Sequence, residues 1–380
     1  MLNEIKAKAP DSQFLSQFFH PTLLQSKPYK LTVKENLTKL DQNESPFDWP
    51  QELKEEILRK LGDTPWNTYP QDYPEELKKA LGARINVSEK NIVLSPGSNY
   101  HISVLLNLFS AKKPTNQIVL TRPSFPLFEG HCLYQNIPYE IWPLNDSYEY
   151  DLDLLPELKP GASVFFASPN NPVGNSLPQK DLLYLLKKYP DCYFIADEAY
   201  WEFAEQDFSK LLEDFSNLFI VRTFSKAMSS AGIRLSYILA SEALCEQIKK
   251  LTLPFLINKF TSIAVTTALK SDQIMDKIKK SIAYQQEEKA KVFNELQKIN
   301  TGKYFEVLNS HTNFLCLTCN SEGSAKKIAE LFKEHQIVIR NVSGPGLPNT
   351  LRITMGKKEA NLRVISILKD FLKQEQTINS

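Results

Sequence analysis

The chain has 380 residues, a formal net charge of +1 and 42% hydrophobic side chains, enough for roughly two or three domains with sizeable cores. The near-neutral charge argues against a nucleic-acid or membrane surface as the main partner. No apolar run approaches the roughly 18 residues that span a bilayer, and the first residues lack the apolar segment of a signal peptide. We therefore expect a soluble, cytoplasmic protein.

The N-terminal two thirds of the chain alternate short apolar strands with amphipathic helices. Residues 1–50 are irregular, and we expect them to form an N-terminal arm that packs on a smaller C-terminal domain. Helices near 51–61 and 74–81 open a large domain, which we place at residues 51–260. The strands expected in it are 91–94, 117–121, 163–167, 192–196, 218–223 and 236–240. This alternation predicts an α/β fold with a mostly parallel, mixed central sheet.

The pattern changes after Pro254. A long helical stretch from about 262 to 297, with a break near Ser271, precedes expected strands at 305–308, 313–317, 337–340 and 351–354 and helices at 324–335 and 358–373. We expect residues 261–380 to form the smaller α+β domain. The Cys316-Leu-Thr-Cys319 pair has the spacing of metal ligands, but no second pair is nearby, so a buried strand and no metal site is the expected structure.

Chemistry-bearing residues follow the expected strands directly, where open parallel sheets bind their ligands. The turn of Gly97, Ser98 and Asn99 precedes a helix, whose first N–H groups suit an anion, although Ser and Asn also suit a plain helix cap. The chain contains neither GxGxxG nor GxxxxGK[ST], which disfavours a nucleotide.

Three further strand ends carry an Asn-rich turn (SPNNPVGN, 168–175), the pair Asp197 and Tyr200, and Lys226 with Arg234 eight residues later. Each of these elements alone has a plain structural reading as a turn or a solvated charge. Together they match one cofactor, because Lys forms Schiff bases, Ser, Thr and Arg hold phosphate, and Asp pairs with a protonated ring nitrogen. The sequence therefore predicts a site for pyridoxal 5'-phosphate.

With these motifs the chain resembles the fold-type I, class I/II aminotransferases, and within them the histidinol-phosphate aminotransferase branch. The motifs that carry the resemblance are LDQNESP (40–46), YPQDYPEELKKAL (69–81), SPNNPVGN (168–175), ADEAYWEF (196–203), TFSKAMSSAGIR (223–234) and LRITMG (351–356).

The resemblance implies roles for the residues of these motifs. Lys226 would bind the cofactor through its amine and move the substrate proton, Asp197 would pair with the ring nitrogen, and Tyr200 and Asn171 would bind the ring oxygen. Phe125 would stack on the ring. The cofactor phosphate would be bound by Gly97, Ser98, Asn99, Thr223, Ser225 and Arg234.

The resemblance also implies contacts with substrate and with a second subunit. Arg352 would bind the substrate carboxylate, Arg340 a substrate phosphate or a second carboxylate, and Asn43 would lie close to the substrate. Tyr69 would reach the cofactor of a neighbouring subunit, which implies a homodimer.

The expected activity is ping-pong transfer of an amino group between L-glutamate and a 2-oxo compound, with imidazole acetol phosphate and histidinol phosphate as the first choice of second substrate pair. Aromatic amino acid transamination and a threonine-phosphate decarboxylase-like lyase reaction remain alternatives. The segment Phe47-Asp-Trp49 replaces the usual Tyr-Gly of the family near the substrate entrance, which leaves the substrate open.

Overall fold

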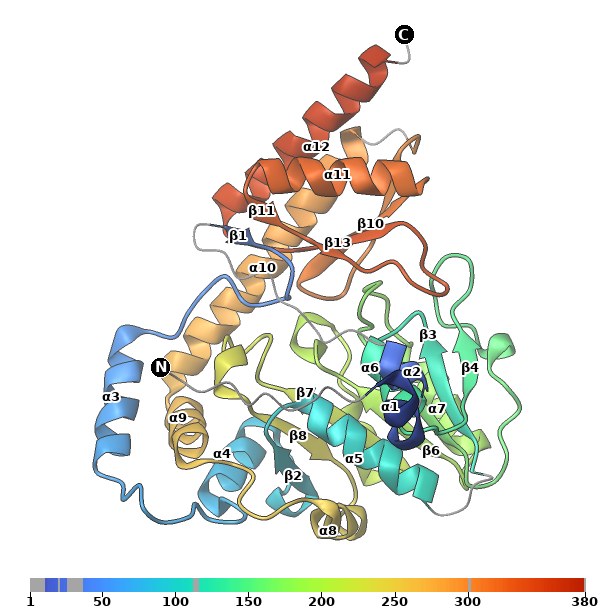
Figure 1. The fold of residues 1–380 in the computed structure, drawn as a ribbon. Coiled ribbons are helices and arrows are strands. Elements are labelled where there is room, and N and C mark those ends of the chain that lie inside the picture. Colours follow the sequence, from blue (N-terminus) through green and yellow to red (C-terminus); the bar gives the residue numbers. More distant parts are fainter. Residues whose placement is uncertain (1–10, 20, 26–36, 112–115, 300–301, 379–380) are drawn as a thin grey trace.

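A computed structural model of the chain describes residues 11–19, 21–25, 37–111, 116–299 and 302–378 (Figure 1). Its helices are α1 (Ser12–Phe18), α2 (Pro21–Gln25), α3 (Gln51–Gly62), α4 (Glu75–Ile85), α5 (Ser98–Ala111), α6 (Pro126–Tyr134), α7 (Gln179–Lys188), α8 (Glu242–Leu251), α9 (Lys259–Lys270), α10 (Asp272–Ile299), α11 (Glu322–Glu334) and α12 (Lys358–Ile378). None of the helices in these ranges combines the length and apolar character needed to cross a bilayer.

A seven-stranded sheet with the order β2-β8-β7-β6-β5-β3-β4 forms the larger half of the fold. Its strands are β2 (Ile92–Ser95), β3 (Ile118–Arg122), β4 (Glu140–Pro143), β5 (Ser163–Ala167), β6 (Tyr193–Asp197), β7 (Leu218–Thr223) and β8 (Ser236–Leu239). Only β8 runs antiparallel to its neighbours. The predicted α/β fold with a mostly parallel, mixed sheet is therefore confirmed.

Helices cover both faces of this sheet, which is why its strands read as continuous apolar runs. Residues of α4, α7 and α9 join one buried cluster with one face, and residues of α5, α6 and α8 join a second cluster with the other. The six strands other than β8 run in the same direction, so their carboxyl ends meet at one edge of the sheet.

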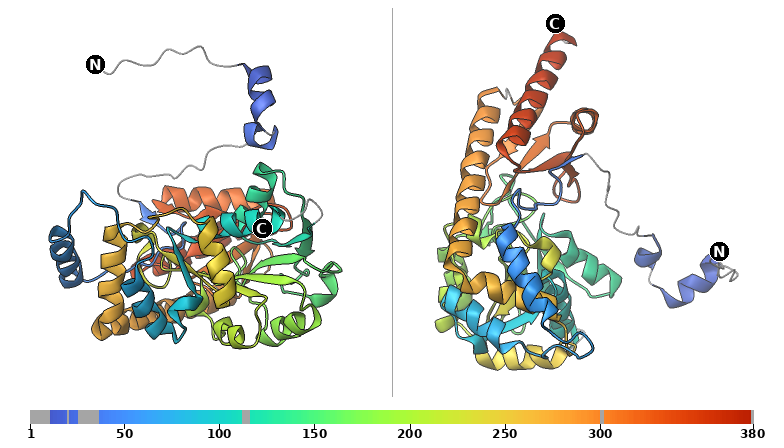
Figure 2. Two further views of the ribbon diagram at one scale, coloured as in Figure 1. Left: turned by 90° about the horizontal axis from the view of Figure 1, so that it is seen from below. Right: turned by 90° about the vertical axis from the view of Figure 1, so that its left-hand side faces the viewer.

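A second, antiparallel sheet of order β12-β13-β10-β9 packs against α10, α11 and α12. Its strands are β9 (Phe305–Leu308), β10 (Phe314–Cys319), β12 (Arg340–Asn341) and β13 (Thr350–Thr354). Near it, β1 (Thr38–Lys39) pairs in parallel with β11 (Ile337–Val338). Figure 2 shows this unit stacked on the large one, with α12 projecting beyond it.

The domain limits at residues 50 and 260 stay predictions. The pairing of β1 with β11 agrees with an N-terminal arm on the smaller unit, but residues 1–10 and 26–36 lie outside the described residues. Helix α10 belongs to both units, since Ile278 joins a core of the large sheet and Leu296 joins that of the small sheet.

The structure differs from the sequence-based expectation at α6 and β4, which we did not predict, and at residues 337–340. Strand β4 lies at the sheet edge and ends at Pro143, so it lacks the buried apolar pattern of the central strands. The single strand expected at 337–340 is two, and the second places Arg340 in the small sheet.

Cys316 and Cys319 are both buried in β10, as predicted. Their separation of three residues places them on opposite faces of the strand, which no single metal ion can bridge. The described part of the chain contains no cluster of side chains suited to a metal ion.

Candidate active site

The loops after four strands, β2, β5, β6 and β7, converge at the carboxyl edge of the large sheet. Asp197 ends β6, Thr223 ends β7, and Lys226 follows in the next turn. Gly97 lies between β2 and α5, and Asn171 lies in the turn after β5. The predicted positions therefore come together because parallel strands deliver their carboxyl ends to one edge.

A cradle of hydroxyl and guanidinium groups surrounds Gly97. The Arg234 guanidinium lies so close to Gly97 that a Cβ atom there would collide with it, and Gly97 has a φ of +111°. Arg234 Nη1 donates to Ser225 Oγ at 3.4 Å, and Thr223 Oγ1 donates to Ser225 Oγ at 3.0 Å. Ser98 and Asn99 open α5, where backbone N–H groups lack intrahelical partners. This arrangement suits a bound anion.

Lys226 and Asp197 form the charged centre of the site. Burial, and after it the nearby positive charge of Arg352, lowers the pKa of Lys226 to about 8. Burial raises the pKa of Asp197 to about 7, while the Ala199 N–H that Asp197 accepts at 3.1 Å opposes the rise. A lysine with a pKa near neutrality supplies the neutral amine that a nucleophile or general base requires.

Tyr200 lies between Lys226 and the N-terminal segment. Its ring is 5.9 Å from Lys226 Nζ and packs edge-on against Phe314. Asn43 Nδ2 donates to the Tyr200 hydroxyl at 2.7 Å, and burial raises the pKa of Tyr200 to about 12. The phenol therefore stays protonated near neutral pH and is available as a donor.

Arg352 projects from β13 of the small sheet into the same site. Its Nη1 donates to Asn171 Oδ1 at 2.5 Å and its Nη2 donates to the Asp41 carbonyl at 2.8 Å. Its Nε is buried without a partner. Arg340 lies directly opposite Arg352 on β12, so the two side chains are cross-strand neighbours.

Phe125 and Tyr69 each pack against another aromatic ring. Phe125 precedes α6 and packs edge-on against Phe128, while the adjacent Ser124 donates to Asn170 Oδ1 at 2.8 Å. Tyr69 is 79% exposed and stacks on Phe255 at 4.6 Å. The structure thus places Phe125 next to the Asn170–Asn171 turn, and it leaves the Tyr69 ring largely exposed.

The sequence-based reasoning missed several groups that complete the site. The Gln42 carbonyl accepts from Lys226 Nζ at 2.9 Å. Thr354 Oγ1 donates to Asn43 Oδ1 and accepts from the Asn43 N–H, both at 3.0 Å. Gln42 and Thr354 stand within the LDQNESP and LRITMG motifs, so the motifs flagged the segments but not the contacts.

A family profile described as Aminotransferase class I and II matches residues 35–368. The chain belongs to this family. A histidinol-phosphate aminotransferase of Pyrococcus furiosus is 32% identical over 353 residues, which cover 93% of this chain and 97% of that protein. Members of the family depend on pyridoxal 5'-phosphate, so this aminotransferase does as well.

Solved structures agree with this family. The histidinol-phosphate aminotransferase of Sinorhizobium meliloti, in complex with pyridoxal-5'-phosphate, superposes with a TM-score of 0.79 at 25% identity, covering 93% of this chain and 98% of that one. An L-threonine-O-3-phosphate decarboxylase of Porphyromonas gingivalis gives 0.75 at 22% identity over 89% of this chain and all of that one. The second likeness shows the shared fold alone.

The residues of this aminotransferase fit the cofactor. The turn at Gly97 packs against Arg234 so closely that it has no room for a Cβ atom, and it brings together the donors that a phosphate needs. Buried Asp197 suits a protonated ring nitrogen, since such a partner would stabilise its ionised form. The unpartnered Arg352 Nε is a further donor at the place where a substrate anion would lie.

Proposed function

We propose that this aminotransferase transfers an amino group between L-glutamate and imidazole acetol phosphate, with L-histidinol phosphate as product. The name of the Pyrococcus furiosus relative supports this choice, since the alignment covers nearly all of both chains. The observation that carries the proposal is the cross-strand pair Arg340 and Arg352. Two guanidinium groups on one sheet face suit the two carboxylates of glutamate and the dianionic phosphate of the second substrate.

The proposed chemistry rests on the chain's own residues. When bound, the cofactor stabilises negative charge at the substrate Cα atom. Lys226 would accept the proton from the substrate Cα atom and pass it to the C4′ atom of the cofactor, a role that its lowered pKa favours. Asp197 keeps the ring nitrogen protonated, and Tyr200 donates to the ring oxygen. Asn171 orients Arg352, which binds the substrate anion.

A substrate panel tests this proposal. Holoenzyme loaded with L-glutamate is offered imidazole acetol phosphate, phenylpyruvate and, separately, O-phospho-L-threonine, with release of carbon dioxide measured for the last. We expect the highest kcat/KM for imidazole acetol phosphate. A higher value for phenylpyruvate would support aromatic transamination, and carbon dioxide release without amino transfer would support the lyase alternative.

The role of Arg340 is tested by Arg340→Ala. Losing a charge-assisted contact to phosphate should lower kcat/KM for imidazole acetol phosphate by about tenfold or more, against about twofold for phenylpyruvate. Arg363→Ala, on α12, is the matched arginine control. Equal losses for both substrates would remove the phosphate role.

We propose a homodimer in the cytoplasm, in which Tyr69 contacts the partner's cofactor. The exposure of Tyr69 supports this contact, and five free cysteines suit a reducing compartment. Hybrid dimers of Tyr69→Ala and Lys226→Ala chains test it. If Tyr69 acts across the interface, each hybrid has one intact site and regains activity that both parent variants lack. Hybrids as inactive as their parents would show that Tyr69 acts within its own chain.

A further inference from the structure

A cavity of about 490 Å³ lies between the short helix η3 (Trp201–Phe203) and the first half of α10. This volume is within the range of small-molecule sites, roughly 300–1,000 Å³. Its walls are mainly apolar and include Phe224 and Met228 from the loop after β7 and Ile278 from α10. Among the described residues that line it, Lys226, Asp197 and Arg352 do not appear, but Thr223 of the phosphate cradle does, so the cavity adjoins the candidate active site.

Two charged groups at the cavity already have partners. Arg84 forms an ion pair with Asp272 at 2.7 Å, and Asp207 pairs with buried Arg222 at 2.5 Å. Lys279 lies at the mouth with its side chain 76% exposed. Because these charged groups are already paired or solvated, none of them needs a ligand to neutralise its charge.

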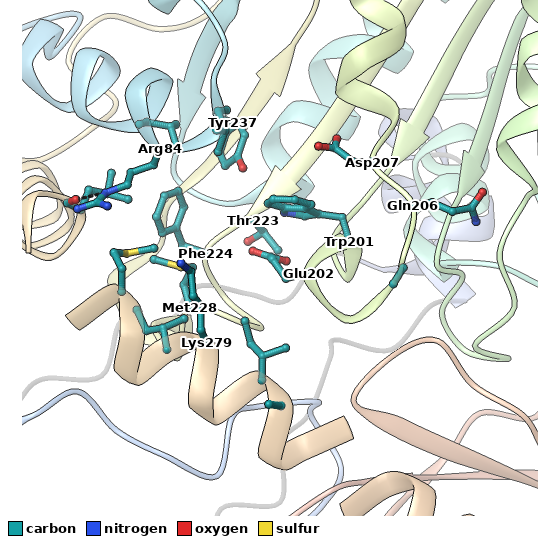
Figure 3. A pocket seen from close by; sticks show the side chains of 18 of the residues that line it. Arg84, Trp201, Glu202, Gln206, Asp207, Thr223, Phe224, Met228, Tyr237 and Lys279 are labelled. Atoms are coloured by element: carbon teal, nitrogen blue, oxygen red, sulfur yellow. Dashed lines mark hydrogen bonds between the residues drawn. The ribbon is translucent and has the colours of Figure 1, made fainter. Parts of the chain in front are cut away.

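Glu202 and Trp201 are different. Glu202 Oε2 and Trp201 Nε1 are both buried without a hydrogen-bond partner of proper geometry, although the Trp201 side chain lies close enough to Glu202 to lower its pKa. Figure 3 shows both side chains directed from η3 towards the space in front of α10. Buried polar atoms in folded proteins nearly always have a partner, so two such atoms in the wall of one cavity indicate a place for a polar ligand group.

The charge state of Glu202 indicates which group fits. Burial raises the pKa of Glu202 to about 8, and its own backbone N–H, the nearby Arg222 and the neighbouring Trp201 side chain only partly oppose this rise. A cation placed against the carboxylate would restore its ionised form. A divalent metal ion is a poor candidate, because it needs several oxygen ligands and most of the wall is apolar.

We propose that this cavity is an effector site for a small organic cation, with a protonated amine on Glu202 Oε2 and an apolar ring or chain between Phe224, Met228 and Ile278. The apolar walls supply the area for the ligand body, and Glu202 supplies the single charged contact that orients it. The Trp201 N–H faces an acceptor or ring of the same ligand.

The position of the cavity connects it to the active site. Helix η3 follows Tyr200 directly, and Phe224 and Met228 flank Lys226 in the chain. Helix α10 begins against the large-sheet core and ends in the small-sheet core. A ligand between η3 and α10 therefore contacts the segments that carry Tyr200 and Lys226 and the helix that joins the two units. Its binding consequently changes the transamination rate.

Calorimetry on the holoenzyme tests binding, with N,N-dimethylphenethylamine as the probe. This tertiary amine is a cation at neutral pH but forms no Schiff base with the cofactor. The matched neutral and anionic compounds are 2-phenylethanol and 3-phenylpropionate. We expect the amine to bind and the other two to bind at least about tenfold more weakly. Equal binding of all three, or no binding of the amine, would overturn the proposal.

Variants locate the bound amine. Glu202→Gln should weaken its binding by about tenfold or more, whereas Glu205→Gln, an exposed residue of the same cavity, should change it by less than about twofold. Ala283→Trp, at an exposed position of α10, should block the cavity while the protein stays folded. Binding that survives both Glu202→Gln and Ala283→Trp would place the amine elsewhere and overturn the site.

The effector role has its own readout. Saturating amine should change kcat of the wild-type holoenzyme and leave kcat of the Ala283→Trp variant as it is without amine. Binding at Glu202 without any change in kcat would overturn the effector role. Because binding is measured by heat and not by turnover, this outcome is distinct from a failure of the proposed amino-transfer reaction.

Discussion

Asn43 donates a hydrogen bond from its side-chain amide to the hydroxyl of Tyr200 at 2.7 Å, across 157 positions of the chain. The same Asn43 exchanges two hydrogen bonds with Thr354 of β13 and is 1% exposed. One buried amide therefore joins the N-terminal segment, the large sheet and the small sheet at the candidate active site. Its substitution should affect both stability and catalysis.

Asn43→Ala should lower the free energy of unfolding by about 1–3 kcal/mol, because the Tyr200 and Thr354 hydroxyls lose a buried partner. Asn43 also has a φ of +55°, which costs alanine more than asparagine or glycine. Asn43→Gly should therefore lie between the wild type and Asn43→Ala in urea denaturation. Wild-type stability in both variants would contradict the role of this hydrogen-bond network.

Gly97→Ala should weaken the binding of pyridoxal 5'-phosphate by about tenfold or more, since the new Cβ atom would displace the Arg234 guanidinium and strain the backbone. Gly232→Ala is the matched control. Gly232 lies in the segment that leads to Arg234, and a Cβ atom there would meet nothing within 4 Å. Absorbance titration of the apoprotein measures both. Similar affinities for the two variants would argue against the cradle.

The raised pKa of Asp197 predicts that the stability of the cofactor-free protein depends on pH. Its raised pKa means that the folded protein holds a proton between the ordinary value of 3.8 and about 7, where the unfolded chain does not. The contribution of Asp197 therefore lowers stability as pH rises through this window. Lys226 is protonated in both the folded and the unfolded chain over this pH range, so it adds no pH dependence to the stability.

Asp197→Asn removes this slope. Its stability relative to the wild-type apoprotein should increase from pH 4 to pH 7 by on the order of a few kcal/mol. Urea denaturation at several pH values measures the difference, with the exposed Asp191→Asn as control. A difference that is constant across this window would show that the carboxyl group of Asp197 titrates normally.

The buried ion pair beneath the site predicts a strong coupling. Arg222 is fully buried and pairs with Glu198 at 2.6 Å, and Glu198 adjoins Asp197. Arg222→Met should destabilise the protein by about 3–5 kcal/mol, because it leaves Glu198 charged and unpaired. The double variant with Glu198→Gln should recover part of this loss. Additive losses in thermal unfolding would rule out the coupling.

Local sequence patterns were sufficient for much of the fold and of the site. Apolar runs and the motifs at their ends located β5, β6 and β7 and the residues that follow them, because burial pattern and turn chemistry are local properties. Edge strand β4 escaped detection since its half-exposed residues lack that pattern. Arg340 could be named from a motif, but its position opposite Arg352 depends on the pairing of β12 with β13.

The sequence by itself determined which side chains stand at the strand ends, and with them the family and the cofactor. Only the tertiary structure decided which distant groups complete the site: the Gln42 carbonyl on Lys226, 184 positions away, and Asn43 on Tyr200. The cavity beside Glu202 is likewise decided by the tertiary structure, since it forms where α10 packs against η3. These contacts follow from the packing of separate units, which leaves no periodic signal in any one stretch of the chain.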